Sequence, residues 1–330
     1  MFLTINQIKN ITFGAVSVFE NNGYIEFDRF TEKQKQAYKL YRTVSLYGKV
    51  NCASGIRLSF ITDAMSFKME YVLINASSRN FAYFDVIIDG EMIGHFGTDN
   101  LTQEEGVYET LLKSGKKHVE VYFPFSAKVK IKSVELLGGS IFEPKKRKYT
   151  MISYGDSITQ GYDAVYPSKS YVNKLACFLD ADLYNKAVGG DTFFPELLES
   201  KDVIIPDIVT VGYGTNDWSK CSYEEFCFNL NAFFERLYEN FEYSKIIVIT
   251  PIWREVTRNK PFIGITLDEL RAQIKKVALS YNNVTVIDGD NLVPPTPSLF
   301  SDEYLHPNDD GFDYYSKNLI NEVIKSGFKN

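Results

Sequence analysis

The pattern of apolar residues changes at about residue 145 of this 330-residue chain. Up to that point, short alternating or apolar runs follow one another, separated by turn residues such as Asp89-Gly90. Beyond it, apolar runs alternate with stretches of helical periodicity. Several short strands at such spacing indicate a β-sandwich or jelly roll, whereas strands that alternate with helices indicate a parallel sheet. We therefore predict two domains, residues 1–145 and 146–330.

The strands of the first domain are predicted from their alternation and from the turns between them. No long helical pattern interrupts them, although residues 30–41 are ambiguous. The runs that we interpret as strands are 56–62, 69–74, 84–88, 91–94, 118–123 and 129–136.

In the second domain, the run Ile246-Ile247-Val248-Ile249 lacks alternation, as expected of a strand that is buried on both faces. About five such strands covered by helices predict a three-layer α/β/α fold with a parallel sheet. The predicted strands are 148–153, 182–188, 208–213, 245–250 and 284–288, and the predicted helices are 168–179, 196–200, 223–239, 267–281 and 310–325.

Composition excludes several classes of protein. The formal net charge of −6 and the single short basic run, 145–148, argue against a nucleic-acid-binding protein. No secretory signal and no apolar segment long enough to span a membrane is visible, so we expect a cytoplasmic protein without a membrane partner, although a chain whose signal had been removed would look the same. The four cysteines form no Cys-x-x-Cys pair, which argues against a structural zinc site.

The predicted parallel strands each end in residues that carry chemistry. The first is followed by Gly155-Asp156-Ser157-Ile158, where Ser157 is either a nucleophile on a tight turn or a plain helix cap. Gly189-Gly190 follows the second, Gly214-Thr215-Asn216-Asp217 the third, and His306-Pro307 lies beyond the fifth. Such sheets place their sites at the carboxyl ends of the strands, and acyl transfer needs a hydroxyl, a base and several N–H donors together.

These four stretches, in this order and spacing, resemble the motif blocks of the SGNH/GDSL hydrolase superfamily over about residues 148–325. The resemblance implies a flavodoxin-like α/β/α domain that hydrolyses esters by a serine–histidine mechanism, without a metal or another cofactor. More loosely, the first domain resembles the sandwich that precedes this domain in some carbohydrate-esterase-like members. We expect a small-molecule or oligosaccharide ester as substrate; the oligomeric state stays open.

Carried over to this sequence, the resemblance makes Ser157 the nucleophile and His306 its base. It implies an oxyanion hole formed by the N–H groups of Ser157 and Gly190 and the side-chain amide of Asn216. Asn216 has an alternative role as a helix cap, and the neighbouring Asp156 and Asp217 are expected to brace their loops.

The acid that orients His306 departs from the family pattern, because the usual Asp-x-x-His spacing falls on Glu303. Spacing therefore favours Glu303, with Asp302 a near-equal alternative and a serine–histidine dyad the third possibility.

Aromatic and charged residues beside these motifs are candidates for substrate binding. We predict that Trp218, Trp253 and Arg254 lie along the same edge of the sheet, where a tryptophan can stack on a sugar ring. Packing of either tryptophan inside a loop is an equally good interpretation. Tyr162 and Phe193-Phe194 are further candidates for the rim. The expected reaction is hydrolysis of a small acyl ester, with an acetyl group on a carbohydrate as the first choice; a lysophospholipase or thioesterase of the same family, and an inert carbohydrate-binding protein, are the alternatives.

Overall fold

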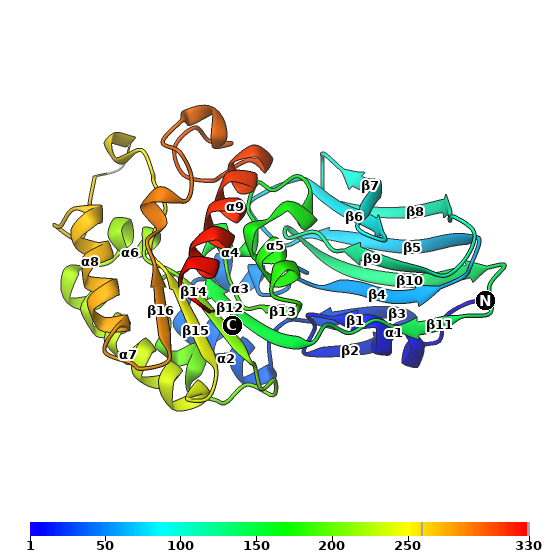
Figure 1. The fold of residues 1–330 in the computed structure, drawn as a ribbon, viewed down its shortest axis with the longest axis horizontal. Helices are drawn as coiled ribbons and strands as arrows, with labels where there is room; N and C mark the ends of the chain where they lie inside the picture. The colour runs from blue at the N-terminus through cyan, green and yellow to red at the C-terminus, as the bar shows by residue number, and fades with distance from the viewer. Residues whose placement is uncertain (259, 329–330) are drawn as a thin grey trace.

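The computed structural model describes residues 1–258 and 260–328. The ribbon shows two lobes side by side along the long axis, with the N-terminus at the far end of the β-rich lobe (Figure 1). The antiparallel sheets of the first lobe end at Pro144 and the parallel sheet of the second begins at Tyr149.

Two antiparallel sheets pack face to face in the first lobe, as the alternation predicted. One has the order β1-β4-β9-β6-β7 with β11 beside β4, and the other has the order β2-β3-β10-β5-β8. Their strands are β1 (Thr12–Phe13), β2 (Ser17–Asn21), β3 (Tyr24–Asp28), β4 (Arg57–Thr62), β5 (Ser66–Asn75), β6 (Ala82–Ile88), β7 (Glu91–Thr98), β8 (Gln103–Leu111), β9 (Lys117–Tyr122), β10 (Ala127–Leu137) and β11 (Phe142–Pro144). The sequence pattern did not predict β1, β2, β3, β8 or β11.

Strand β10 shows how the sequence specifies this sandwich. Val129 and Ile131 point into the core between the sheets, while Lys128 and Lys130, which alternate with them, are half-buried and ion-paired to Glu26. A bulge between Ile131 and Ser133 shifts the pairing with β5, and Val134 then faces the same core. Alternation therefore decides which face of the strand is buried.

The ambiguous segment at residues 30–41 is helical. After α1 (Ile5–Ile11), the helices α2 (Glu32–Tyr41) and α3 (Val44–Lys49) interrupt the strands. Thr31 and Gln34 form a reciprocal capping box that starts α2. Tyr38 of α2 is buried in the same hydrophobic core as Val209 and Val211 of the parallel sheet. This segment thus belongs to the first domain by sequence but packs into the second lobe, so a boundary at residue 145 stays a proposal.

The second lobe is a five-stranded parallel sheet in the order β13-β12-β14-β15-β16. Its strands are β12 (Tyr149–Gly155), β13 (Ala181–Asn185), β14 (Ile208–Gly212), β15 (Lys245–Ile249) and β16 (Val284–Ile287). The order reverses between β12 and β14, and in doubly wound sheets ligands bind in the crevice at such a switch point. The three-layer fold is confirmed.

Helices cover both faces of this sheet. Leu175 of α5 (Tyr171–Phe178) and Leu319 of α9 (Asp309–Lys325) share one core with Ile247. Leu230 of α7 (Tyr223–Phe241) and Leu270 of α8 (Leu267–Ala278) share the opposite core with the sheet. Figure 1 shows α5 and α9 together on one side of the strands. The helices are α4 (Ser157–Gln160), α5 (Tyr171–Phe178), α6 (Thr215–Lys220), α7 (Tyr223–Phe241), α8 (Leu267–Ala278) and α9 (Asp309–Lys325), with 3-10 turns at Pro167–Lys169, Pro195–Leu198, Val256–Arg258, Gly289–Asn291 and Pro297–Leu299. Across the described part of the chain, no helix is both long and apolar enough to cross a membrane.

Candidate active site

The carboxyl ends of β12 and β14 carry the first site residues. Ser157 is the first residue of α4, separated from the end of β12 by Asp156 alone, and is 5% exposed. The side chain of Asp156 caps this turn by accepting the Ile158 N–H at 3.0 Å, and Gly161 ends it with φ at 100°. Glycine adopts this left-handed conformation without steric cost, which allows the helix to end after one turn. The strand and this single turn therefore fix the serine at the sheet edge.

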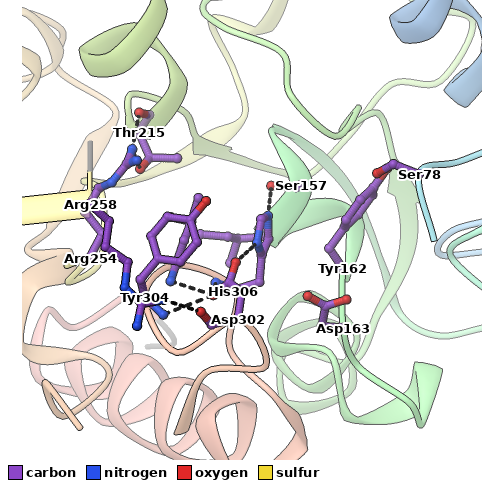
Figure 2. A network of polar contacts seen from close by, with 12 residues as sticks. Ser78, Ser157, Tyr162, Asp163, Thr215, Arg254, Arg258, Asp302, Tyr304 and His306 are labelled. Carbon is purple, nitrogen blue, oxygen red and sulfur yellow. Dashed lines mark hydrogen bonds and ion pairs between the residues drawn. The ribbon is translucent and has the colours of Figure 1, made fainter. Parts of the chain in front are cut away.

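Ser157, His306 and Asp302 form a chain of hydrogen bonds (Figure 2). Ser157 Oγ lies 2.8 Å from His306 Nε2, and His306 Nδ1 lies 2.6 Å from Asp302 Oδ2. A carboxylate at Nδ1 holds the proton on that nitrogen and leaves Nε2 free to accept the serine proton. The arrangement can thus activate Ser157 as a nucleophile.

Asp302, rather than Glu303, contacts His306, so the preference for Glu303 from spacing is wrong. Glu303 has a positive φ of 64°, its side chain is 69% exposed, and it pairs with Arg258 at 3.1 Å. Asp302 Oδ1 accepts the backbone N–H groups of Tyr304, Leu305 and His306. These three bonds fold the loop around the Asp302 side chain. As a result, Asp302 Oδ2 contacts His306 Nδ1, although the two residues are four positions apart.

The electrostatics of Asp302 follow from these contacts. Burial alone would raise its pKa, but the hydrogen bond and charge of His306 and the backbone N–H groups outweigh burial and hold the pKa well below its usual range. Asp302 is therefore ionised at neutral pH and can stabilise an imidazolium.

Gly190 and Asn216 lie beside Ser157, as predicted. Together with His306 they line a cavity of about 270 Å³. Gly190 has φ at 94°, and no hydrogen bond within the described ranges uses its N–H. Asn216, in the first turn of α6, donates one amide hydrogen to the Asp191 carbonyl at 3.0 Å, which leaves its second hydrogen for a ligand. Asn216 caps neither nearby helix, because Gly214 is the N-cap of α6 and Ser222 that of the helix at Tyr223–Phe241.

The two tryptophans do not line the cavity. Trp218 is 2% exposed, and its Nε1 donates to the Ile265 carbonyl at 2.8 Å, so it belongs to the core between α6 and the loop before α8. Trp253 packs on Phe300 at 5.0 Å between ring centroids. Packing is therefore favoured over a substrate wall for both residues, within helix α6 for Trp218 and in the loop after β15 for Trp253. Phe193 and Phe194 are likewise core residues.

Arg254 and Tyr162 do line the cavity. Figure 2 shows them on opposite sides of His306. Arg254 donates from Nη1 to the carbonyl and hydroxyl of Thr215, at 2.8 Å and 3.0 Å. The ring of Tyr162 covers Gly189, where a Cβ would lie 2.6 Å from the ring.

Sequence reasoning missed seven further lining residues, among them Ser219 and Leu305. The other five are Lys49, Ser78, Arg79, Lys220 and Tyr304. Lys220 stands four residues after Asn216 on the same helix, so recognising α6 would have identified it. Lys49 and Arg79 come from the β-rich lobe and carry no local signal for this role.

Asp156 and Asp217 are buried behind the cavity. Burial raises the pKa of Asp156 to about 6 and that of Asp217 to about 7. Asp217 Oδ1 accepts the Phe193 N–H at 3.1 Å, while its Oδ2 has no partner among residues 1–258 and 260–328. It braces α6 against the loop that follows Gly190. The described residues contain no group of three or more side chains suited to a metal ion.

We expect Asp217→Asn to make stability less sensitive to pH. The folded protein holds the Asp217 proton up to about pH 7, whereas an unperturbed carboxyl loses it near 3.8. The folded state therefore binds more protons between these values, and the free energy of unfolding falls as pH rises through that window. Asparagine cannot ionise, so the variant should gain about 2–4 kcal/mol relative to wild type between pH 5 and pH 8.

Urea unfolding at pH 5 and pH 8 measures this difference, with Asp310→Asn at an exposed position as the control. If Asp217→Asn changed the free energy of unfolding equally at both pH values, Asp217 would have to be ionised in the folded protein at pH 5.

Comparison with known proteins matches residues 153–314 to the GDSL-like lipase/acylhydrolase family. A comparison with the sequences of curated proteins gave no match. Among solved structures, the salicylyl-acyltransferase SsfX3 from a tetracycline biosynthetic pathway is similar, with a TM-score of 0.83 and 23% identity over 96% of this chain and 94% of that one.

Two further structures share the fold. A Bacteroides ovatus protein assigned as a GDSL-like lipase has a TM-score of 0.72 and 19% identity, covering 98% of this chain and 97% of that one. A family two carbohydrate esterase from Clostridium thermocellum, in complex with cellohexaose, has a TM-score of 0.67 and 16% identity over 84% and 95% of the two chains.

The matched residues contain Ser157, Gly190, Asn216, Asp302 and His306, the side chains and backbone that meet at the carboxyl edge of the parallel sheet. An ester hydrolase built on an SGNH-like sheet with a β-rich region before it accounts for both the sequence match and the fold. This chain carries a domain of the GDSL-like lipase/acylhydrolase family.

Proposed function

We propose that this protein is a serine-dependent esterase that removes small acyl groups, in the first place acetyl, from a carbohydrate. The observation that carries the proposal is the continuous hydrogen-bonded chain from Ser157 Oγ through His306 to Asp302. A protein that only binds carbohydrate has no need of a nucleophile and a base in this geometry, so the inert alternative is disfavoured.

The reaction runs in two steps. His306 Nε2 takes the proton of Ser157 as Oγ attacks the ester carbonyl, and then gives this proton to the departing alcohol, which leaves an acyl-serine. A water molecule, deprotonated by the same nitrogen, attacks the acyl-serine, and the proton returns to Ser157 as the carboxylic acid leaves. Asp302 keeps the imidazole oriented and stabilises its positive charge in both steps.

Substrate size is the second part of the proposal. The cavity of about 270 Å³ is lined mainly by polar and charged side chains, with Leu305 as its one aliphatic member among the described residues. A long acyl chain would find little apolar surface there, whereas an acetyl group needs little. Similarity to family two carbohydrate esterases and to an acetyl xylan esterase from Butyrivibrio proteoclasticus supports a carbohydrate as the alcohol.

Hydrolysis of 4-nitrophenyl acetate, butyrate and octanoate tests this part. We expect kcat/KM to fall from acetate to octanoate by about tenfold or more, because the longer chain stays in water or displaces polar groups. A rate that rises toward octanoate would favour the lysophospholipase or thioesterase alternative.

Asn216→Ala tests the oxyanion hole that we assign to the N–H groups of Ser157 and Gly190 and the amide of Asn216. Loss of one oxyanion donor lowers kcat by about 100-fold or more, with a smaller change in KM. Asn231→Ala on the exposed side of α7 is the matched control, since its amide bonds only to Cys227 of the same helix. Near-wild-type kcat in Asn216→Ala would refute the assigned role.

Transfer of the acyl group to an alcohol is a second candidate function. It is favoured by the similarity to an acyltransferase over 96% of this chain. Product analysis with an added acceptor alcohol distinguishes the two, because a hydrolase yields free acid even when the alcohol is abundant. Predominant ester product would favour the transferase.

A further inference from the structure

The charge of the cavity around Ser157 points to the kind of ester that it takes. Four of its lining residues are cationic: Lys49 from α3, Arg79 from the loop after β5, Lys220 from the end of α6 and Arg254 from the loop after β15. Among the described residues that line the cavity, none is aspartate or glutamate. The whole chain has a net charge of −6, so this local excess of positive charge runs against the overall balance.

Lys49 and Lys220 reach toward the same point from different elements. Lys49 Nζ donates to the Gly189 carbonyl at 2.6 Å, and Lys220 Nζ donates to the Gly190 carbonyl at 2.8 Å. A Cβ built on Gly190 would lie 3.4 Å from Lys220 Nζ and 3.7 Å from Lys49 Nζ. Each ammonium group has three hydrogens, so each retains donors after its bond to a glycine carbonyl.

These two lysines have no carboxylate partner in the described part of the chain. Burial and the nearby charge of Lys220 lower the pKa of Lys49, and burial lowers that of Lys220. The carboxyls of Asp156, Asp191 and Asp217 oppose the shift of Lys220, but all three are buried behind the wall of the cavity. Asp191 is held there by Arg42 and Tyr38.

The two arginines of the cavity differ in whether a carboxylate bonds to them. Arg79 is neutralised by Asp163, which accepts from Nε and Nη2 at 2.5 Å and 2.8 Å. Arg254 is 3% exposed, stacks over Trp218, and bonds only to neutral oxygens of Thr215. Its buried Nε has no partner among residues 1–258 and 260–328. The charges of Asp156 and Asp302 act on Arg254 from a distance, but neither carboxylate bonds to it. A buried guanidinium without a bonded carboxylate is unfavourable, and an anionic ligand would supply that contact.

We propose that the ester substrate carries a carboxylate, which binds among Lys49, Lys220 and Arg254 while its ester carbonyl faces Ser157. This inference deepens the proposed function and rests on it for the reaction. In a carbohydrate the carboxylate belongs to a uronic acid residue next to the acylated hydroxyl; in the acyl group it belongs to a dicarboxylic half-ester. The shared chemistry is an anion within the cavity, and lysines without internal partners are suited to bind it.

Binding to Ser157→Ala tests the charge preference without requiring turnover. The probes are an O-acetylated methyl glucuronide and the O-acetylated methyl glucoside with the acetyl group at the same position, measured by calorimetry. A second pair, 4-nitrophenyl hydrogen succinate and 4-nitrophenyl butyrate, places the carboxylate on the acyl side. We expect the anionic member of one pair to bind at least about tenfold more tightly, with a preference that shrinks at high salt.

Lysine variants show whether the cavity is the source of the preference. Lys49→Met and Lys220→Met should each lower the ratio of anionic to neutral affinity about tenfold, and Lys49→Arg should restore most of it. Lys113→Met, an exposed lysine of the β-rich lobe paired with Glu91, is the control and should leave the ratio as in wild type. Circular dichroism verifies that each variant is folded.

The outcomes separate this inference from the proposed function. Equal binding of both members of each pair, or a preference that survives the double variant Lys49→Met/Lys220→Met, overturns the carboxylate proposal even if neutral esters are cleaved by Ser157. Preferential anion binding without any serine-dependent hydrolysis supports the inference and contradicts the esterase.

Discussion

Replacing Ser157 by alanine is expected to lower kcat for ester hydrolysis about a million-fold. The substitution removes one oxygen from a side chain that is 5% exposed and bonded to His306 Nε2. Without that oxygen there is no atom to carry the acyl group, so the remaining histidine and N–H donors can at best assist a water molecule. Initial rates with 4-nitrophenyl acetate measure the loss.

A matched serine controls for the loss of a hydroxyl from this region. Ser301 lies in the loop that carries His306, is exposed, and does not line the cavity, so Ser301→Ala should keep wild-type kcat. A fluorophosphonate probe should label wild type and Ser301→Ala but not Ser157→Ala. Retained labelling or turnover in Ser157→Ala would move the nucleophile to another residue.

The second large effect is expected at Asp302. In Asp302→Asn an amide replaces the oxygen that lies 2.6 Å from His306 Nδ1. An N–H at that position favours the tautomer with its proton on Nε2, which cannot accept the serine proton. We expect kcat to fall about 10,000-fold, as for an aspartate that holds a catalytic histidine in the correct tautomer.

The adjacent acid is the natural comparison. Glu303→Gln should change kcat by less than about twofold, because its carboxylate is exposed and paired only with Arg258. Measuring kcat across a pH series for both variants shows whether the loss of activity depends on the protonation state of His306. Equal small effects at both positions would mean that the site works as a serine–histidine dyad.

Local patterns predicted most of the strands and the ends of the parallel sheet. Runs such as 84–88 and 246–249 fall inside β6 and β15, because side chains buried on one or both faces leave a direct imprint on the sequence. Since parallel strands end at a common edge, the positions of Ser157 and Asn216 followed from the strand assignment alone.

The acid beside His306 could not be chosen from spacing. Asp302 and Glu303 are neighbours with the same charge, and the choice depends on the positive φ of Glu303 and on three backbone bonds to Asp302. Backbone dihedrals of a loop are set by tertiary packing rather than by local sequence. Trp218 illustrates the same limit, since only the position of Ile265 shows that its ring points into the core.

The cations of the cavity depend on contacts between residues that are far apart in the sequence. Lys49 lies 140 residues from the glycine carbonyl that it contacts, and Arg79 lies 84 residues from Asp163. Neither residue stands in a motif or at a predicted strand end. Their shared location becomes visible only when the β-rich lobe is placed against the parallel sheet.

The segment around α2 and α3 limits where this protein can be cut into separate domains. The guanidinium of Arg29 is buried and donates to the carbonyls of Asn185 and Ala187, while Tyr38 and Arg42 hold Asp191 beside Gly190. A gene fragment that starts at residue 146 encodes every family motif, yet it lacks these side chains and Lys49. Exchange of the β-rich lobe for that of a relative would therefore remake the catalytic pocket, and the smallest transplantable unit of this enzyme includes residues 29–50.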